Sequence, residues 1–266
     1  MAIWNIKERN KLVRANDIRG DLGIFMGGSA NWDYVNISTL GNAVTWGNIE
    51  AVHTPTDQST DACASSNTRG VNALGYSGSP VSAYTNVINY FEFAHLGNTA
   101  DFGDTTSART NATGAGNNIR GLFFGGEGAG GGTNIVDYVT IASIGNAIDF
   151  GNLSQNNWTF SAVASTTRAI RGGGTGPRVN IIEYFTISST GDATDFGDLT
   201  VTRSDACEGS GGSSTRGMFI AGNTGSLTDV VDYITIASIG DAIDFGDLTT
   251  ASSNGGTASN SIRAVT

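Results

Sequence analysis

One frame of sequence recurs five times along this chain of 266 residues. Residues 137 to 153 read DYVTIASIGNAIDFGNL and residues 232 to 248 read DYITIASIGDAIDFGDL, so the two segments are identical at 14 of 17 positions. Every copy has a tyrosine, a glycine seven residues later and an aromatic residue twelve residues later. The five tyrosines are Tyr34, Tyr90, Tyr138, Tyr184 and Tyr233. Repeats of this kind are typical of folds in which neighbouring units bury one another's apolar faces.

Each unit of roughly 48 residues contains four short apolar runs separated by glycine-rich turns, which is the pattern of a four-stranded antiparallel blade. We name these expected strands A to D; in the unit that starts at Asp61 they are residues 61–66, 71–76, 87–93 and 99–103. A recurring arginine precedes strand B, with successive spacings of 51, 48, 48 and 47 residues. The five arginines are Arg69, Arg120, Arg168, Arg216 and Arg263.

Strand C indicates how the blades are arranged. In the segment IVDYVTI, Ile135, Val139 and Ile141 point to one face of the strand, while Val136 and Tyr138 point to the other. Both faces are apolar, so both must be covered, as they are in blades stacked around an axis. The small Ala and Ser residues of strand A suit the crowded position next to that axis. The sequence therefore predicts an all-β fold, a five-bladed β-propeller of four-stranded antiparallel blades.

Two further features concern turns and ring closure. A Gly-Asn or Gly-Asp step between strands C and D is expected to supply positive φ for the turn; its glycines are Gly97, Gly145, Gly191 and Gly240. Residues 256–266 match strand A and the start of strand B. We expect the chain termini to close the ring, with this segment pairing with strands B, C and D of the first unit to complete blade one.

The expected domain organisation is an N-terminal arm, residues 1–17, followed by a single propeller, residues 18–266. The arm lies outside the repeat and mixes apolar with basic side chains. Either it supplies strand A of blade one, in place of the C-terminal segment, or it anchors the protein in a neighbouring subunit. Its anchoring side chains would be Ile3, Trp4 and Ile6.

The repeat resembles two known patterns. Gly27-Gly28, Tyr34 and Trp46 resemble the Kelch repeat, although phenylalanine replaces the tryptophan in four units and the double glycine becomes Ala221-Gly222 in one. The wording TRGxFxGG followed by YxTIASxGNAxDFGDL is similar to repeats in virion proteins of tailed bacteriophages, notably marine ones. This resemblance implies a virion component assembled in the bacterial cytoplasm, with other virion proteins and a host-surface glycan or protein as partners.

Composition and charge exclude several other classes. Acidic residues outnumber basic ones 24 to 14, and the net charge of -10 argues against a nucleic-acid partner. No apolar stretch approaches the length needed to cross a bilayer, and the charged N-terminus does not resemble a signal peptide, so we expect no membrane insertion. The two cysteines, Cys63 and Cys207, are 144 positions apart and do not form a disulfide framework.

Motifs for catalysis and metal binding are weak. The tripeptide D-F-G occurs four times, but the other motifs of a protein kinase are absent from the sequence. His53 and His95 fall in no zinc or triad motif. Carboxylate pairs such as Asp101 with Asp104 either bind calcium or accept hydrogen bonds from turn amides. We expect a protein without a catalytic centre, cofactor or resident metal.

Loop variation indicates where recognition takes place. The B–C connections differ in length although the frame around them does not, and B–C and D–A loops share one face of a four-stranded blade. We predict that Tyr84, Trp158 and Arg178 contact a ligand or partner, because aromatic residues and arginine are enriched at binding hot spots. The alternative is that they are ordinary half-buried loop residues. The recurring arginines would lie on the opposite rim, bonded to turn carbonyls or docking an acidic neighbour.

The sequence thus predicts a non-catalytic virion structural or adhesion component, either a decoration or a tail-fibre propeller. The alternative is a carbohydrate-binding or carbohydrate-hydrolysing propeller. The fold cannot choose between them, because propellers serve many unrelated functions.

Overall fold

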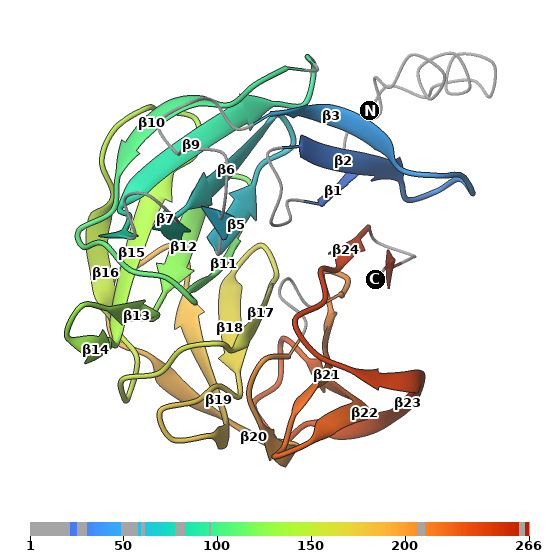
Figure 1. Ribbon diagram of the computed structural model, residues 1–266. Coiled ribbons are helices and arrows are strands. Elements are labelled where there is room, and N and C mark those ends of the chain that lie inside the picture. The colour runs from blue at the N-terminus through green and yellow to red at the C-terminus, as the bar shows by residue number, and fades with distance from the viewer. Residues whose placement is uncertain are drawn as a thin grey trace.

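Five small antiparallel sheets stand in a ring, and together they form a five-bladed β-propeller (Figure 1). The computed structural model describes residues 22–25, 31–48, 58–59, 62–77, 83–95, 97–206, 211–260 and 264–265. Within these ranges every regular element is a strand. The predicted fold class is confirmed.

Blades two, three and four each have four strands in the order A, B, C, D. The strands of blade two are β5 (Ala62–Ser65), β6 (Arg69–Ala73), β9 (Val87–Glu92) and β10 (Ala100–Asp104). Those of blade three are β11 (Thr113–Gly116), β12 (Arg120–Phe124), β15 (Ile135–Thr140) and β16 (Ile148–Asn152). Those of blade four are β17 (Ser161–Ala164), β18 (Arg168–Gly172), β19 (Val179–Thr186) and β20 (Thr194–Arg203).

Blades one and five show strands B, C and D as three-stranded sheets. Blade one contains β1 (Leu22–Phe25), β2 (Asn31–Asn36) and β3 (Val44–Asn48). Blade five contains β21 (Arg216–Asn223), β22 (Leu227–Thr235) and β23 (Ile243–Ser252). A single bridge between Gly212 and Gly217 marks the innermost position of blade five.

The core lies between blades, as the apolar faces of strand C predict. One buried cluster joins side chains of blades two and three, a second joins blades three and four, and a third joins blades four and five. Phe150 of strand D is 2% exposed and makes edge-to-face contact with Tyr138 of its own blade and Phe185 of the next. Because each blade covers the face of its neighbour, stacking buries both sides of the sheet.

Recurring arginines link consecutive blades on the rim that carries the A–B and C–D turns. In blades two to five the guanidinium lies over the tyrosine of its own blade, at 4.4 to 4.7 Å from the ring centre. In blades two to four it also donates a hydrogen bond of 2.9 to 3.0 Å to a carbonyl oxygen of the next blade. The acceptors are Ile141, Ile187 and Ile236. These three arginines therefore bond to turn carbonyls, the structural role considered from the sequence, because each acceptor is the first residue of the C–D turn in the neighbouring blade.

The C–D turns make a second link between blades. Gly145, Gly191 and Gly240 adopt positive φ, as predicted. The Asn or Asp that follows each glycine accepts a backbone hydrogen bond of 2.9 to 3.1 Å from strand D of the preceding blade. The acceptors are Asn146, Asp192 and Asp241. The Gly-Asn or Gly-Asp step thus fixes the spacing of blades as well as the turn.

The C-terminal segment lies between blades five and one, but it does not join the sheet of blade one. Strand β24 (Ala258–Ser259) pairs with β25 (Ala264–Val265), and the sheet of blade one is β1-β2-β3. Ala258 packs against Gly23 of β1 without a ladder between the two strands. The prediction that this segment completes blade one is therefore wrong, because its partner is its own following strand.

Candidate recognition surface on the loop rim

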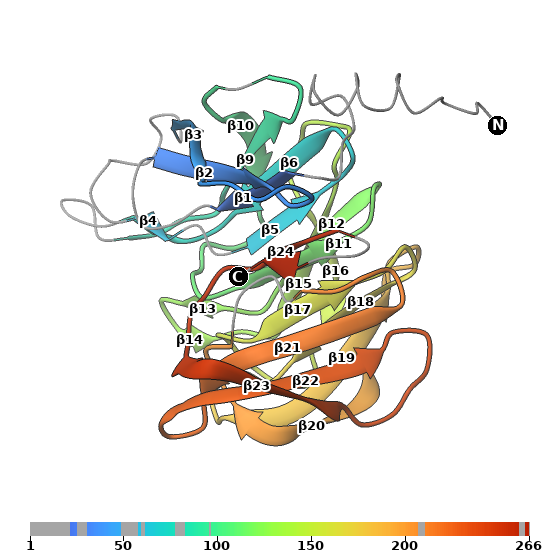
Figure 2. The ribbon, with the colours of Figure 1, turned by 90° about the vertical axis from the view of Figure 1, so that its right-hand side faces the viewer.

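The B–C and D–A loops occupy one edge of the ring, as the sequence predicts. Three short strands form a small sheet there: β4 (Gln58–Ser59), β7 (Tyr76–Ser77) and β8 (Ala83–Tyr84). The B–C loop of blade three forms the hairpin β13 (Glu127–Gly128) and β14 (Gly131–Gly132). Figure 2 shows β4, β13 and β14 at the same edge of the propeller.

The D–A segments after blades one to four pair with the end of strand B or the B–C loop of the blade that follows. Strand β4 pairs with β7, and three isolated bridges repeat this contact around the rim. The bridged pairs are Thr110 with Glu127, Trp158 with Thr175, and Ser204 with Asn223. Backbone hydrogen bonds therefore hold loops of different sequence in equivalent places.

Buried ion pairs anchor the same segments. In blades three, four and five, the residue before the repeat tyrosine is a carboxylate that meets an arginine, and these side chains are at most 3% exposed. The pairs are Arg109 with Asp137 at 2.9 Å, Arg171 with Glu183 at 2.6 Å, and Arg203 with Asp232 at 2.6 Å. Arg109 comes from a D–A segment, Arg203 is the last residue of strand D in blade four, and Arg171 lies in strand B. Charges are rarely buried this deeply unless they are paired.

Asp232 shows how such a carboxylate is satisfied. It accepts hydrogen bonds from the hydroxyl and amide of Thr200, at 2.6 and 3.2 Å, in addition to its bond with Arg203. Arg203 also donates to the carbonyl oxygens of Phe219 and Val230, at 3.2 and 2.9 Å. The pair therefore fastens the end of strand D in blade four to strands B and C of blade five.

Burial and partner charge act on these arginines in opposite directions. Desolvation lowers the pKa of Arg109 and of Arg171, and the carboxylates Asp137 and Glu183 oppose that change by favouring the charged form. An arginine remains protonated in proteins, so each pair is an ion pair at neutral pH. Removing one partner would leave an uncompensated buried charge.

The structure places Tyr84, Trp158 and Arg178 on this rim, and all three side chains are half-buried. The indole of Trp158 packs against the backbone of Gly132 and Gly176, at positions where an added Cβ would overlap the ring. Trp158 thus joins the B–C loops of blades three and four. Its close packing on glycine favours the alternative that it is a structural loop residue.

The other two candidates also make contacts within the chain. Arg178 donates hydrogen bonds of 3.3 Å from Nε to Ser204 Oγ and from a terminal nitrogen to Asn223 Oδ1. Tyr84 lies edge-to-face with Tyr76, with ring centres 5.5 Å apart. Tyr76 is 37% exposed, and the sequence analysis did not single it out. Contact of these residues with a ligand stays a prediction.

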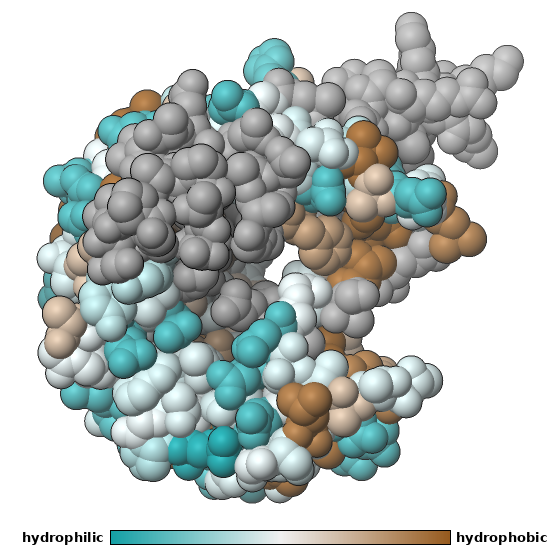
Figure 3. Space-filling model, viewed as in Figure 1, coloured by the Kyte–Doolittle hydropathy of each residue, from teal (hydrophilic) through white to brown (hydrophobic). Residues whose placement is uncertain are grey.

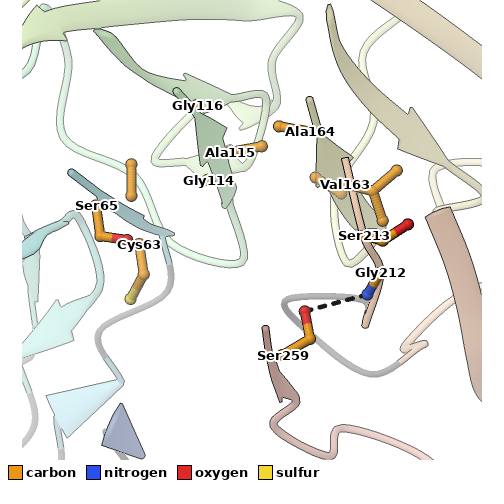
Figure 4. Close-up of a pocket in the computed structure, with 12 residues that line it drawn as sticks. Cys63, Ser65, Gly114, Ala115, Gly116, Val163, Ala164, Gly212, Ser213 and Ser259 are labelled. Atoms are coloured by element: carbon orange, nitrogen blue, oxygen red, sulfur yellow. Dashed lines mark hydrogen bonds between the residues drawn. The ribbon is translucent and has the colours of Figure 1, made fainter. Parts of the chain in front are cut away.

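A hollow lies on the axis, where strands A converge (Figure 4). Its volume is about 210 Å³, below the roughly 300 Å³ at which ligand pockets usually begin. Small residues line it, and the side chains with polar atoms are Cys63, Ser65, Ser213 and Ser259. The amide of Gly212 donates to Ser259 Oγ at 3.1 Å across this hollow. Its size and lining suit water or a small solute.

Most of the other candidate residues from the sequence lie outside the described residues. The anchoring residues Ile3, Trp4 and Ile6 lie outside the described residues, as do His53 and Cys207. His95 is exposed in a turn. Among the described residues, no group of three or more His, Cys, Asp or Glu side chains is placed to hold a metal ion. The described part of the chain also has no helix long and apolar enough to span a membrane.

The buried carboxylates were not predicted from the sequence. Their signal is an acidic residue, Asp137, Glu183 or Asp232, directly before the repeat tyrosine of an otherwise apolar strand. Blade two has Asn89 at this position, and it is 2% exposed. No protein-family model matches the chain, and no curated protein matches its sequence.

Proposed function

We propose that the protein is a non-catalytic structural or adhesion component of a virion, a decoration or tail-fibre propeller that binds other virion proteins or a host surface. The observation that carries this proposal is the loop rim, where loops of different sequence stand on one repeated scaffold. Variable loops on a rigid scaffold are a common arrangement for recognition. The resemblance of the repeat to virion proteins of tailed bacteriophages supports the assignment to a particle.

The buried charges fit this proposal because they have structural partners. Arg109, Arg171 and Arg203 each hold a carboxylate of strand C and also bond to backbone carbonyls or neighbouring side chains. They fix the D–A segments or the inner strands from which the loops project. A rigid base lowers the entropy that the loops lose on binding.

The proposed contact surface centres on the aromatic pair Tyr76 and Tyr84. The two rings lie on the small sheet β4-β7-β8, and Tyr76 is the more exposed of the two. Tyrosine offers a large apolar face and a polar hydroxyl at little conformational cost, which suits recognition of a protein or a glycan.

Purified particles provide the test. The chain should be present in stoichiometric amount, and deleting its gene should reduce particle integrity or attachment to the host. Particles that carry Tyr76→Ala and Tyr84→Ala should attach less well, whereas Ile144→Ala, which changes a 60% exposed residue on the opposite rim, should have no effect. Absence of the chain from particles would refute the proposal.

The same aromatic pair keeps a carbohydrate-binding or carbohydrate-hydrolysing propeller as the second candidate. Sugars present apolar faces to aromatic rings while their hydroxyls require polar partners. A glycan array would identify the ligand, and the release of new reducing ends would distinguish hydrolysis from binding. Binding that survives Tyr84→Ala unchanged would exclude this site.

A further inference from the structure

The junction between blades five and one differs from the other four junctions in the ring. The aromatic residue of strand D is at most 4% exposed in the first four blades, where the next blade covers it. These residues are Trp46, Phe102, Phe150 and Phe196. Phe245, the equivalent residue of blade five, is 55% exposed. The outer face of blade five is therefore uncovered.

The backbone shows the same difference. The glycine after the aromatic residue normally lies against the C–D turn of the next blade, so that an added Cβ would overlap the turn glycine. Gly151 against Gly191 is one example, and Gly47, Gly103 and Gly197 repeat it. At Gly246 of blade five, an added Cβ would meet nothing within 4 Å. No described residue takes the place of the next turn.

Arg216 is the third sign of a missing neighbour. It lies 4.4 Å from the ring centre of Tyr233, as its counterparts lie over their own tyrosines. Its side chain is exposed, and no hydrogen-bond acceptor is found for it in the described part of the chain. Arg69, Arg120 and Arg168 instead donate to a carbonyl of the next blade.

The C-terminal hairpin occupies part of this junction. Strands β24 and β25 pair Ala258 with Val265, in the register that pairs Ala64 with Val71 in strands A and B of blade two. A Cβ on Gly23 of blade one would meet Ala258, just as a Cβ on Gly121 of blade three would meet Ala64 of blade two. The hairpin therefore has the place of strands A and B in a blade that precedes blade one.

The ring therefore has a sixth blade position between blades five and one, and the described residues fill only the places of its strands A and B. Ser259 of β24 contacts Gly212 of blade five, so the hairpin spans the junction near the axis. No described strand has the place of strands C and D farther out. Figure 1 shows β24 between the sheets of blades one and five, and Figure 3 shows a notch in the ring there, with apolar residues on both sides.

We infer that this notch is a docking site for a β-hairpin that has the strand C and strand D pattern of this repeat and completes a sixth blade. The repeat defines the chemistry of that hairpin. Its first strand pairs with β25 and covers Phe245 with apolar side chains. Its turn carries Gly-Asn or Gly-Asp, so that the glycine rests on Gly246 and the side chain accepts a hydrogen bond from the amide of Asp247. A carbonyl at the end of the first strand accepts from Arg216.

Such an occupant fits better than a second copy of this chain. Strands C and D of all five blades are already paired within the described sheets. A second copy could donate a hairpin only by dismantling one of its own blades. Addition of strands to an exposed sheet edge is an established mode of peptide recognition. The inference goes beyond the proposed function, because the notch lies on a blade face and not on the loop rim.

The test uses the full chain and a labelled synthetic peptide with the sequence of residues 228–248, the C–D hairpin of blade five, which carries five aspartates for solubility. Fluorescence anisotropy should show saturable binding with one peptide per chain. Phe245→Asp should weaken binding by roughly tenfold or more, because it places a charge under the apolar face of the peptide. Arg216→Ala should weaken binding by a smaller factor, and a scrambled peptide should not bind.

Ile144→Asp is the matched control, because Ile144 is a 60% exposed apolar residue of a C–D turn away from the notch. It should leave peptide binding unchanged, and the thermal unfolding of each variant reports whether the fold is intact. No saturable binding, or equal binding by wild type and Phe245→Asp, would overturn the inference. So would a dimer of the chain, seen by light scattering, that Phe245→Asp dissociates, since a second copy would then be the occupant.

Discussion

Removing the carboxylate of the pair Arg203–Asp232 should be one of the most destabilising single changes in the molecule. Both side chains are 0% exposed, and Asp232 accepts bonds of 2.6 Å from Arg203 and from the Thr200 hydroxyl. Asp232→Ala leaves the guanidinium charged and buried without the carboxylate that compensates its charge. Breaking a buried pair in this way typically costs about 3–5 kcal/mol. The change also opens the joint between blades four and five.

The double variant Arg203→Met, Asp232→Leu provides the matched comparison. It removes both charges and replaces them with apolar side chains, a change that is often neutral or stabilising. We expect the double variant to recover most of the stability that Asp232→Ala loses. If it does, the cost lies in the unpaired charge rather than in the loss of the pair itself.

Urea unfolding followed by circular dichroism measures the free energy of unfolding of each variant, provided that the m-values agree. A loss below about 1 kcal/mol for Asp232→Ala would refute the reasoning, because a loss that small is typical of an ion pair that is exposed to solvent. Equal destabilisation by the single and double variants would refute it as well. That result would mean that the hydrogen bonds, and not charge compensation, hold the joint.

Two further predictions concern the packing between blades, and a third concerns calcium binding. Phe150→Ala should cost about 3–5 kcal/mol in urea unfolding, because its ring is 2% exposed, whereas Phe245→Ala should cost less than about 1 kcal/mol; similar losses would contradict the uncovered face of blade five. Gly151→Ala should lower the free energy of unfolding by about 1–3 kcal/mol more than Gly246→Ala does. Both glycines have positive φ, but only a Cβ at Gly151 would meet the backbone of the next blade, and equal melting temperatures of the two variants would be inconsistent with that contact. Calorimetric titration of calcium into chelator-treated protein should give no binding heat, and a saturable exothermic isotherm would show that the carboxylates of the D-F-G segments in strand D bind the ion.

The architecture was predictable because the repeat carries it in several places at once. The tyrosine, glycine and aromatic positions fix strands C and D, and the two apolar faces of residues 135–141 require a neighbour on each side. Small residues such as Ala64 and Gly114 fit strand A next to the axis. Local pattern and global packing therefore agree in this chain.

The buried ion pairs were not predictable, because their partners have no fixed spacing. Asp137 pairs with an arginine of a D–A segment and Asp232 with the last residue of a strand D, whereas Glu183 pairs with Arg171 of strand B. Trp158 shows a related difficulty. An aromatic residue in a variable loop is typical of an exposed contact residue, and the sequence does not show that glycines from other loops pack against its ring.

The prediction that the C-terminal segment joins the sheet of blade one was wrong for a different reason. Residues 258–259 have the sequence of strand A, and such a strand can either enter the sheet of blade one or contact it from the adjacent position. The two arrangements bury similar small side chains near the axis. Sequence pattern cannot distinguish them, because it reports which faces are apolar and not which edge receives a hydrogen bond.

A crystal structure of the full chain without added peptide tests the central claim most directly. The account predicts five radial sheets, four closed junctions, and Phe245 exposed beside a β24–β25 hairpin whose Ala258 lies against Gly23. A ring in which blade five packs on blade one and buries Phe245 would contradict it.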